Sequence, residues 1–109
     1  MKKIIELTNK LCIEEKLLLD KISSYIFCET AQNADDDSYF IRFSDIEKNY
    51  HLPKNFINDI IAEKIRKNFL RKFKKQTIDF DFFSIKKLFV ITLYNNYITE
   101  INQFNCIDN

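Results

Sequence analysis

The side chains best suited to recognise a ligand lie in two stretches in the second half of the chain. In the first, Lys54, Asn55 and Asn58 follow Pro53. An Asn side chain can form two hydrogen bonds with an adenine edge, and a Lys ammonium can bond guanine acceptors or a phosphate. The second stretch holds seven cations and no acid: Lys64, Arg66, Lys67, Arg71, Lys72, Lys74 and Lys75. Such a run is typical either of a solvated helix face or of a phosphate-binding surface.

The residues around these stretches predict two helices separated by a tight turn. Ser44 and Glu47 have the spacing of a capping box, so we expect a short helix to begin at Ser44. That helix must end near Tyr50, because the residue before Pro53 is disfavoured in the helical region. Pro53 suits the first turn of a longer helix that reaches about Leu70. Two helices joined in this way form a helix-turn-helix, whose second helix lies in the major groove of DNA.

The longer helix is expected to have one buried and one exposed side. Its apolar residues predict a stripe that faces the core and comprises Phe56, Ile57, Ile60, Ile61, Ile65 and Phe69. On the exposed side, Lys54, Asn55 and Asn58 lie near the helix start and are candidates for base or phosphate contacts. Asp59 and Glu63 lie on the same side and oppose DNA binding, unless they accept hydrogen bonds from cytosine amino groups.

The first part of the chain predicts a helix, a loop and a strand. Residues 11–28 carry apolar side chains at three- and four-residue steps, which indicates a long helix. Residues 29–38 are polar and acidic and predict a loop. Residues 39–43 are aromatic and β-rich and predict a short strand that precedes the helix at Ser44.

Residues 77–94 favour a β-hairpin. Residues 77–82 alternate, with Ile78, Phe80 and Phe82 on one face, which is typical of a half-buried strand. Residues 88–94 are rich in β-branched and aromatic side chains and favour a second strand. A helix remains an alternative for this part of the chain, because its apolar residues also have helical spacing: Ile85, Leu88, Phe89, Thr92 and Leu93.

The C-terminal segment, residues 95–109, has apolar side chains at helical steps within a polar sequence. They are Tyr97, Ile98, Ile101, Phe104 and Ile107. Two interpretations stay open: a final helix packed on the domain, or a helix that binds a second copy or a partner protein. We therefore divide the chain into a domain at 1–94 and a tail at 95–109 that contacts a dimer mate or partner.

The composition excludes several classes of function. Because the chain has no Gly, it lacks a P-loop, a dinucleotide-binding fingerprint and a nucleophile elbow. Cys12, Cys28 and Cys106 lack metal-ligand spacing, and their odd number argues against a disulfide framework. His51 is the only His and has no catalytic or metal-binding partner close to it in the sequence. We expect a protein that is not an enzyme and uses no metal or cofactor.

The charge is nearly balanced overall but unevenly distributed. The 109 residues carry a net charge of +1. Residues 1–50 hold seven Lys or Arg against ten Asp or Glu, and residues 51–109 hold ten against six. The length predicts one domain, and no apolar run is long enough to span a bilayer or to form a signal peptide. These features predict an intracellular, cytoplasmic protein with no membrane contact.

The expected order of helix, strand, helix, helix and hairpin resembles the winged-helix fold, an α+β and mostly helical architecture. Within that fold the chain is similar to the N-terminal domain of RepB-type plasmid replication initiators. The similarity lies in Leu7-Thr8, in residues 14–22, in Phe40 to Ile46 and in the long helix through Phe69. Those initiators carry two winged-helix domains, and this chain has the length of one. The resemblance implies a single-domain regulator, a partition adaptor, or a plasmid- or virus-encoded binding protein.

These observations predict a non-enzymatic protein that binds double-stranded DNA, with transcription regulation as its role and a homodimer as its form. The expected DNA contacts are Ser44, Lys54, Asn55, Asn58, Arg66, Lys67, Arg71, Lys72, Lys74 and Lys75. The expected dimer or partner contacts are Tyr97, Ile98, Ile101 and Phe104. The alternatives are a winged helix that binds proteins, and a DNA-binding module of replication or partition.

Overall fold

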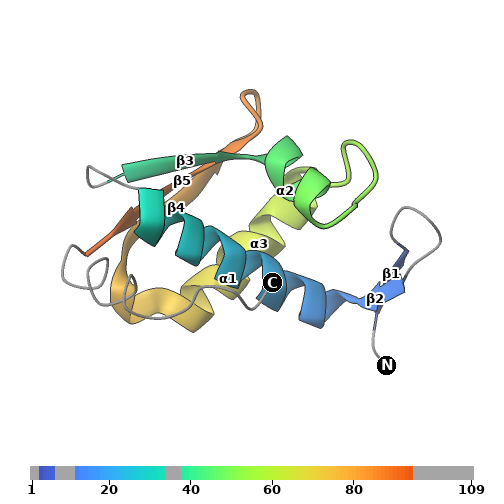
Figure 1. Cartoon of the computed structure of the whole chain (residues 1–109), viewed down its shortest axis with the longest axis horizontal. Coiled ribbons are helices and arrows are strands. Elements are labelled where there is room, and N and C mark those ends of the chain that lie inside the picture. Colours follow the sequence, from blue (N-terminus) through green and yellow to red (C-terminus); the bar gives the residue numbers. More distant parts are fainter. Residues whose placement is uncertain (1–2, 7–11, 34–37, 95–109) are drawn as a thin grey trace.

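The computed structural model of the chain describes residues 3–6, 12–33 and 38–94 (Figure 1). They form an α+β fold with three α-helices and two antiparallel sheets. In chain order the elements are β1 (Ile4–Glu6), β2 (Cys12–Glu14), α1 (Glu15–Asn33), β3 (Ser38–Arg42), α2 (Phe43–Asn49), α3 (Asp59–Phe73), the 3-10 helix η2 (Lys74–Gln76), β4 (Thr77–Phe83) and β5 (Leu88–Leu93).

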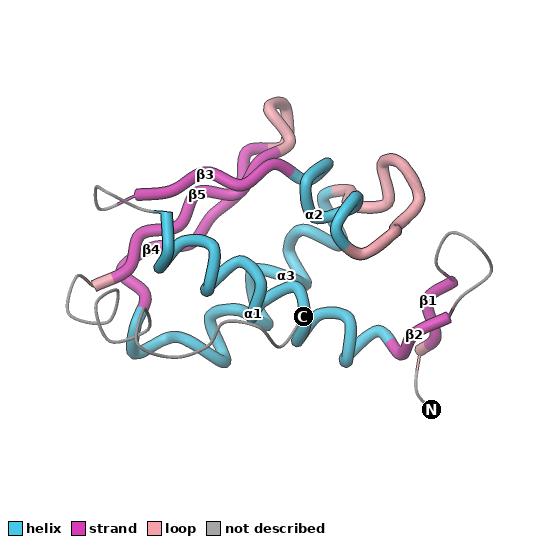
Figure 2. Tube along the Cα trace, in the orientation of Figure 1, coloured by secondary structure: helices cyan, strands magenta, loops and turns pink. Residues whose placement is uncertain are grey.

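The larger sheet joins a single strand to a hairpin. Its strand order is β3-β5-β4, so β5 is central and both of its neighbours run antiparallel to it. The predicted hairpin is confirmed, because β4 and β5 are strands joined by a turn at Ser84–Lys87, and the helical alternative for this region is wrong. Helices α1 and α3 cover one face of this sheet, and the small β1–β2 sheet lies at the N-terminal end of α1 (Figures 1 and 2).

Helix α1 is displaced along the chain from the predicted range 11–28. Cys12–Glu14 pairs with β1, so the helix begins at Glu15, and it continues through the polar residues to Asn33. The predicted loop is therefore wrong for residues 29–33. Thr30 is buried and donates a hydrogen bond to the Ile26 carbonyl (2.8 Å), which lets a polar residue pack within the helix. Residues 34–37, the middle of that predicted loop, lie outside the described part of the chain.

The predicted strand at 39–43 is confirmed with a shift of one residue, but the capping box is wrong. Helix α2 begins at Phe43, and its N-cap is Arg42, which makes no side-chain cap bond. Glu47 is only 7 % exposed and points into the turn that follows α2. There its carboxylate accepts hydrogen bonds from the Ile57 amide (2.9 Å) and the Asn55 amide (3.4 Å). The Ile57 amide is buried and needs an acceptor, and together with the part-buried Asn55 amide it takes the carboxylate that a capping box would have used.

Helix α3 begins six residues later than predicted, at Asp59 rather than Pro53, and extends to Phe73. The residues between Pro53 and Asn58 form a turn, in which Phe56 donates to the Pro53 carbonyl and Asn55 has a positive φ of 62°. Asn58 is the N-cap, and its side-chain oxygen accepts a hydrogen bond from the Ile61 amide (2.9 Å). The helix therefore begins after the N-cap Asn58 and not at Pro53.

The side chains that α3 buries differ in part from the predicted apolar stripe. Ile65 and Phe69 lie in the core as predicted, but Ile60 is 68 % exposed and Ala62 is fully buried. A similar change occurs in β4, where a register shift between Thr77 and Asp79 turns Ile78 outward.

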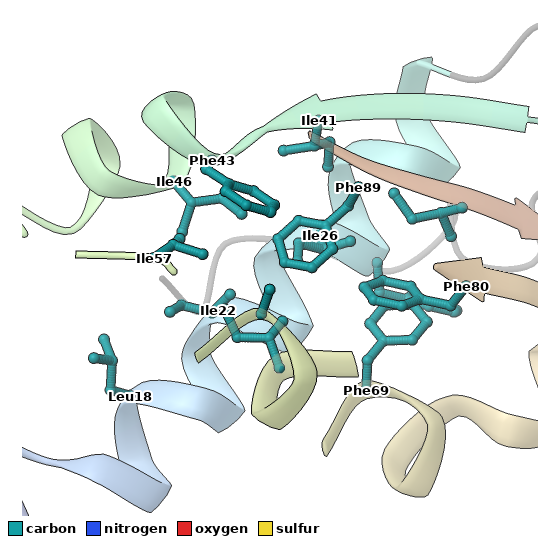
Figure 3. Packing of buried hydrophobic residues seen from close by; sticks show 14 of the residues in the cluster. Leu18, Ile22, Ile26, Ile41, Phe43, Ile46, Ile57, Phe69, Phe80 and Phe89 are labelled. Carbon is teal, nitrogen blue, oxygen red and sulfur yellow. The ribbon is translucent and has the colours of Figure 1, made fainter. Parts of the chain in front are cut away.

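Aromatic contacts hold the hairpin against the helices. Phe80 of β4 stacks on Phe69 of α3, with ring centroids 4.2 Å apart. Phe89 of β5 packs on Phe43 at the start of α2, at 4.8 Å. Figure 3 shows these rings together with Ile26 of α1 in one continuous core. The core therefore fixes the hairpin relative to both α2 and α3, which determines where the hairpin turn lies.

Candidate functional site

The structure brings some of the predicted ligand contacts together with the turn of the hairpin. A hollow of about 120 Å³ is lined by Arg42, Ser44, Asn55, Lys86 and Lys87, with Phe43, Glu47 and Ile57 as its remaining lining. A neighbouring hollow of about 440 Å³ includes Asn55, Asn58 and Lys87. We call the six residues Arg42, Ser44, Asn55, Asn58, Lys86 and Lys87 the tip surface.

The tip surface lies where four segments meet: the end of β3, the start of α2, the turn before α3 and the hairpin turn. The Phe43 amide donates to the Lys87 carbonyl (2.9 Å), which joins the start of α2 to the hairpin turn. The Lys87 ammonium donates to the Asn55 side-chain oxygen (3.4 Å), which joins the hairpin turn to the turn before α3. Asn55 and Lys87 both have positive φ, 62° and 53°. In a chain without Gly these sharp turns use an Asn and a Lys instead.

The electrostatics of the tip surface favour an anion. Arg42, Lys86 and Lys87 supply three positive charges around the smaller hollow. The one carboxylate that lines it, Glu47, is buried and accepts hydrogen bonds from two backbone amides. The larger hollow also includes the acid Asp59 at the start of α3. The positive charge is therefore concentrated on the side of the hairpin turn.

Asn58 keeps part of its hydrogen-bonding capacity for a ligand. Its side-chain oxygen caps α3 by accepting from Ile61. The amide nitrogen of an Asn side chain carries two further donors. Asn58 is exposed, so these donors can reach a phosphate or a base.

The predicted basic run does not lie in the tip surface. It follows α3 toward its C-terminal end, and a helix of this length spans roughly 20 Å. Arg66 and Lys67 form ion pairs with Glu63 (3.4 and 3.9 Å). Lys74 and Lys75 are exposed in η2.

Three further cations of the run contact α1. Lys64 donates to the Glu15 carboxylate (3.3 Å). Arg71 lies 3.8 Å from the Asp20 carboxylate and donates a hydrogen bond to Asn68. Lys72 donates to the Ser24 hydroxyl (3.4 Å) and lies over the Phe73 ring. These contacts join α3 to α1. Lys54, the remaining predicted contact, is exposed in the turn beside Asn55.

Sequence reasoning missed Arg42, Lys86 and Lys87. The predicted hairpin leaves residues 83–87 between its two strands, and this position was a signal that Lys86 and Lys87 would be exposed. It did not predict that β3 pairs with β5, and this pairing sets Arg42 opposite Leu88. Contacts between strands distant in sequence depend on the whole fold, so no local pattern revealed them.

The remaining reactive side chains form no second centre in the described part of the chain. No group of three or more His, Cys, Asp or Glu among those residues is placed to hold a metal ion. Cys28 is a half-buried cysteine on α1 and is not part of a disulfide. None of the described helices is long and apolar enough to cross a membrane. The tail contacts Tyr97, Ile98, Ile101 and Phe104 lie outside the described residues.

A scan against protein-family models, a search of curated proteins and a search of solved structures each found no match to this chain.

Proposed function

We propose that this chain is a winged helix-turn-helix domain that binds double-stranded DNA as a non-catalytic, cytoplasmic regulator of transcription. The order α1, β3, α2, α3 and hairpin supports this fold, as does the pairing of β3 with the hairpin in one sheet. In this arrangement α2 and α3 are the helix-turn-helix, and the β4–β5 hairpin is the wing.

The observation that carries the proposal is the convergence of the tip surface. Cations from β3 and from the hairpin turn meet Ser44 at the start of α2 and two Asn side chains next to α3. Hydroxyl, amide and cationic groups together are the donors that proteins use on DNA phosphates. Because these groups lie beside the start of α3, they would bind the DNA backbone on either side of a groove that α3 enters.

The later start of α3 changes the proposed contacts. Lys54 and Asn55 lie in the turn, so we assign them to phosphates rather than to base edges. Asp59 and Glu63 lie on α3 itself and oppose a deep approach to the bases. We therefore expect phosphate contacts to supply most of the binding energy and sequence preference to be modest.

Fluorescence anisotropy with a labelled duplex of random sequence tests this proposal. If Arg42, Lys54, Lys86 and Lys87 each contact a phosphate, affinity should fall on the order of a hundredfold between 50 and 200 mM salt. Absence of binding at 50 mM salt, or binding that salt leaves unchanged, would refute the DNA proposal.

A protein-binding winged helix is the second candidate, and one observation favours it. The outer side of the sheet has a hollow of about 580 Å³ lined by Phe40, Phe83, Leu88 and Ile85, and Ile85 is 97 % exposed. Exposed apolar patches of this kind mark protein contacts. No DNA binding at low salt would select this candidate. In either case a homodimer or partner contact through residues 95–109 remains part of the proposal.

A further inference from the structure

The three-stranded sheet has two edge strands, β3 and β4. Strand β3 is at the edge of the order β3-β5-β4, and no other strand in the described part of the chain pairs with its free side. The Phe43 amide bonds to the Lys87 carbonyl, and bonded pairs alternate along an antiparallel ladder. Tyr39 and Ile41 therefore bond to β5, and the N–H and C=O groups of Phe40 face the free edge.

A groove runs beside this edge. It has a volume of about 410 Å³ and lies between β3, the second half of α1 and α2. Residues that shape it are Tyr25 and Glu29 of α1, Tyr39 and Phe40 of β3, and Asp45 and Lys48 of α2. None of these belongs to the tip surface, so the groove is separate from the proposed DNA contacts.

The groove has a negative character and polar walls. Glu29 and Asp45 contribute two carboxylates against one ammonium, that of Lys48. Burial and the nearby Glu29 carboxylate together raise the pKa of Tyr25 to about 12. Burial and the same carboxylate also raise the pKa of Tyr39. Both phenols therefore keep their protons at neutral pH, and the Tyr25 hydroxyl is already hydrogen-bonded to Glu29.

We propose that the free edge of β3 binds an extended basic segment of a partner protein as a fourth strand. The backbone of the partner would bond to Phe40, and its Lys or Arg side chains would reach Glu29 and Asp45. Because side chains alternate along a strand, every second residue of the segment would be basic. The intervening side chains would lie beside the exposed ring of Phe40.

The charge pattern favours a partner over the tail of this chain. Residues 95–109 contain Glu100 and Asp108 and no Lys or Arg. Such a segment would bring like charges to Glu29 and Asp45. An unpaired strand edge with exposed polar backbone groups is also a surface that folded proteins use to bind extended peptides.

The first experiment measures the anisotropy of a labelled peptide, Thr-Lys-Val-Lys-Val-Lys-Thr, with its Glu-for-Lys counterpart as the control. We expect saturable binding of the Lys peptide. The Glu peptide should bind at least tenfold more weakly, because it loses about two surface ion pairs with Glu29 and Asp45. The Lys peptide methylated on alternate backbone nitrogens should lose its affinity. Failure of the wild-type protein to bind the Lys peptide would overturn the proposal.

Paired variants separate strand addition from general charge attraction. Phe40→Pro removes the N–H that faces the free edge, and Phe40→Thr removes the same ring but keeps that N–H. We expect Phe40→Pro to bind the peptide about tenfold more weakly than Phe40→Thr. Equal affinity of the two variants would contradict strand addition.

The carboxylates have a matched control on the other edge of the sheet. Glu29→Gln with Asp45→Asn should weaken peptide binding about tenfold, and Asp79→Asn with Asp81→Asn on β4 should leave it unchanged. Equal losses in both pairs would contradict the assigned groove. Sedimentation of the protein alone tests whether it forms a dimer. A dimer that Phe40→Pro dissociates would show that this edge pairs with a second copy of the chain. That result would overturn the proposal that β3 binds a partner protein.

Discussion

At the scale of single residues, Glu47 has the most influence on the candidate site. Its carboxylate binds the amides of Asn55 and Ile57, and its backbone carbonyl accepts from the Leu52 amide (2.8 Å). One residue of α2 therefore determines the path of the turn that carries Asn55. The sequence placed Glu47 in a capping box, because local spacing contains no information about amides ten residues away.

Replacement of Glu47 should destabilise the fold. Glu47→Ala leaves two amides without their acceptor, so we expect a loss of about 2–3 kcal/mol in the free energy of unfolding. Glu47→Gln keeps one acceptor oxygen and should lose less. Urea unfolding measures both, with the exposed Lys48→Ala on the same helix as the control. A Glu47→Ala loss no greater than that of Lys48→Ala would show that the two hydrogen bonds do not hold the turn.

Glu15 predicts a dependence of stability on pH. Burial opposes ionisation of this carboxyl, but hydrogen bonds from Lys3 and Lys64 outweigh burial and lower its pKa from 4.5. Its stabilising contribution is thus present above pH 4.5 and is lost as the pH falls through the lower folded value. Glu15→Gln should cost at most about 1 kcal/mol at pH 7, and the difference from wild type should shrink as the pH falls below 4.5. A difference that grew on acidification would contradict this sign.

At the scale of elements, local pattern was sufficient for the type of α1, β3, α2, α3 and the hairpin, but it misplaced their limits and missed β1 and β2. The strand at β3 and the hairpin follow from β-branched and aromatic composition. The start of α3 was misplaced, because both Pro53 and Asn58 are good starting residues and only the contacts of Glu47 with the turn select Asn58. The register shift in β4 could not be predicted either, because Ile78, Phe80 and Phe82 alternate without interruption in the sequence.

The register shift in β4 predicts that two substitutions in this strand have unequal effects on stability. Ile78 is 54 % exposed, whereas Phe80 is buried and stacks on Phe69. Ile78→Ser should change the free energy of unfolding by no more than about 0.5 kcal/mol. Phe80→Ala should cost about 3–5 kcal/mol, because it leaves a cavity in the aromatic core. Urea unfolding compares the two, and similar losses would place Ile78 in the core and contradict the register shift.

At the scale of the whole molecule, the candidate site depends on how the sheet assembles. Ser44, Asn55 and Asn58 could be predicted as contacts from the helix-turn-helix pattern. Arg42, Lys86 and Lys87 join them only because β3 pairs with β5 and because Phe43 packs on Phe89. The cations from Arg66 to Lys75 looked like one surface in the sequence. In the fold, Arg71 and Lys72 contact α1, and Arg66 and Lys67 share Glu63.

DNA binding by the tip surface can be compared with binding by the cations of η2. Lys86→Glu with Lys87→Glu and Lys74→Glu with Lys75→Glu make the same change of charge at two places in the fold. Both double variants are assayed on the labelled random duplex at 100 mM salt, after circular dichroism has shown native folding. We predict that reversal at the hairpin turn weakens binding about tenfold or more, and that reversal in η2 weakens it much less. Equal losses, or a larger loss from η2, would refute DNA binding at the tip surface.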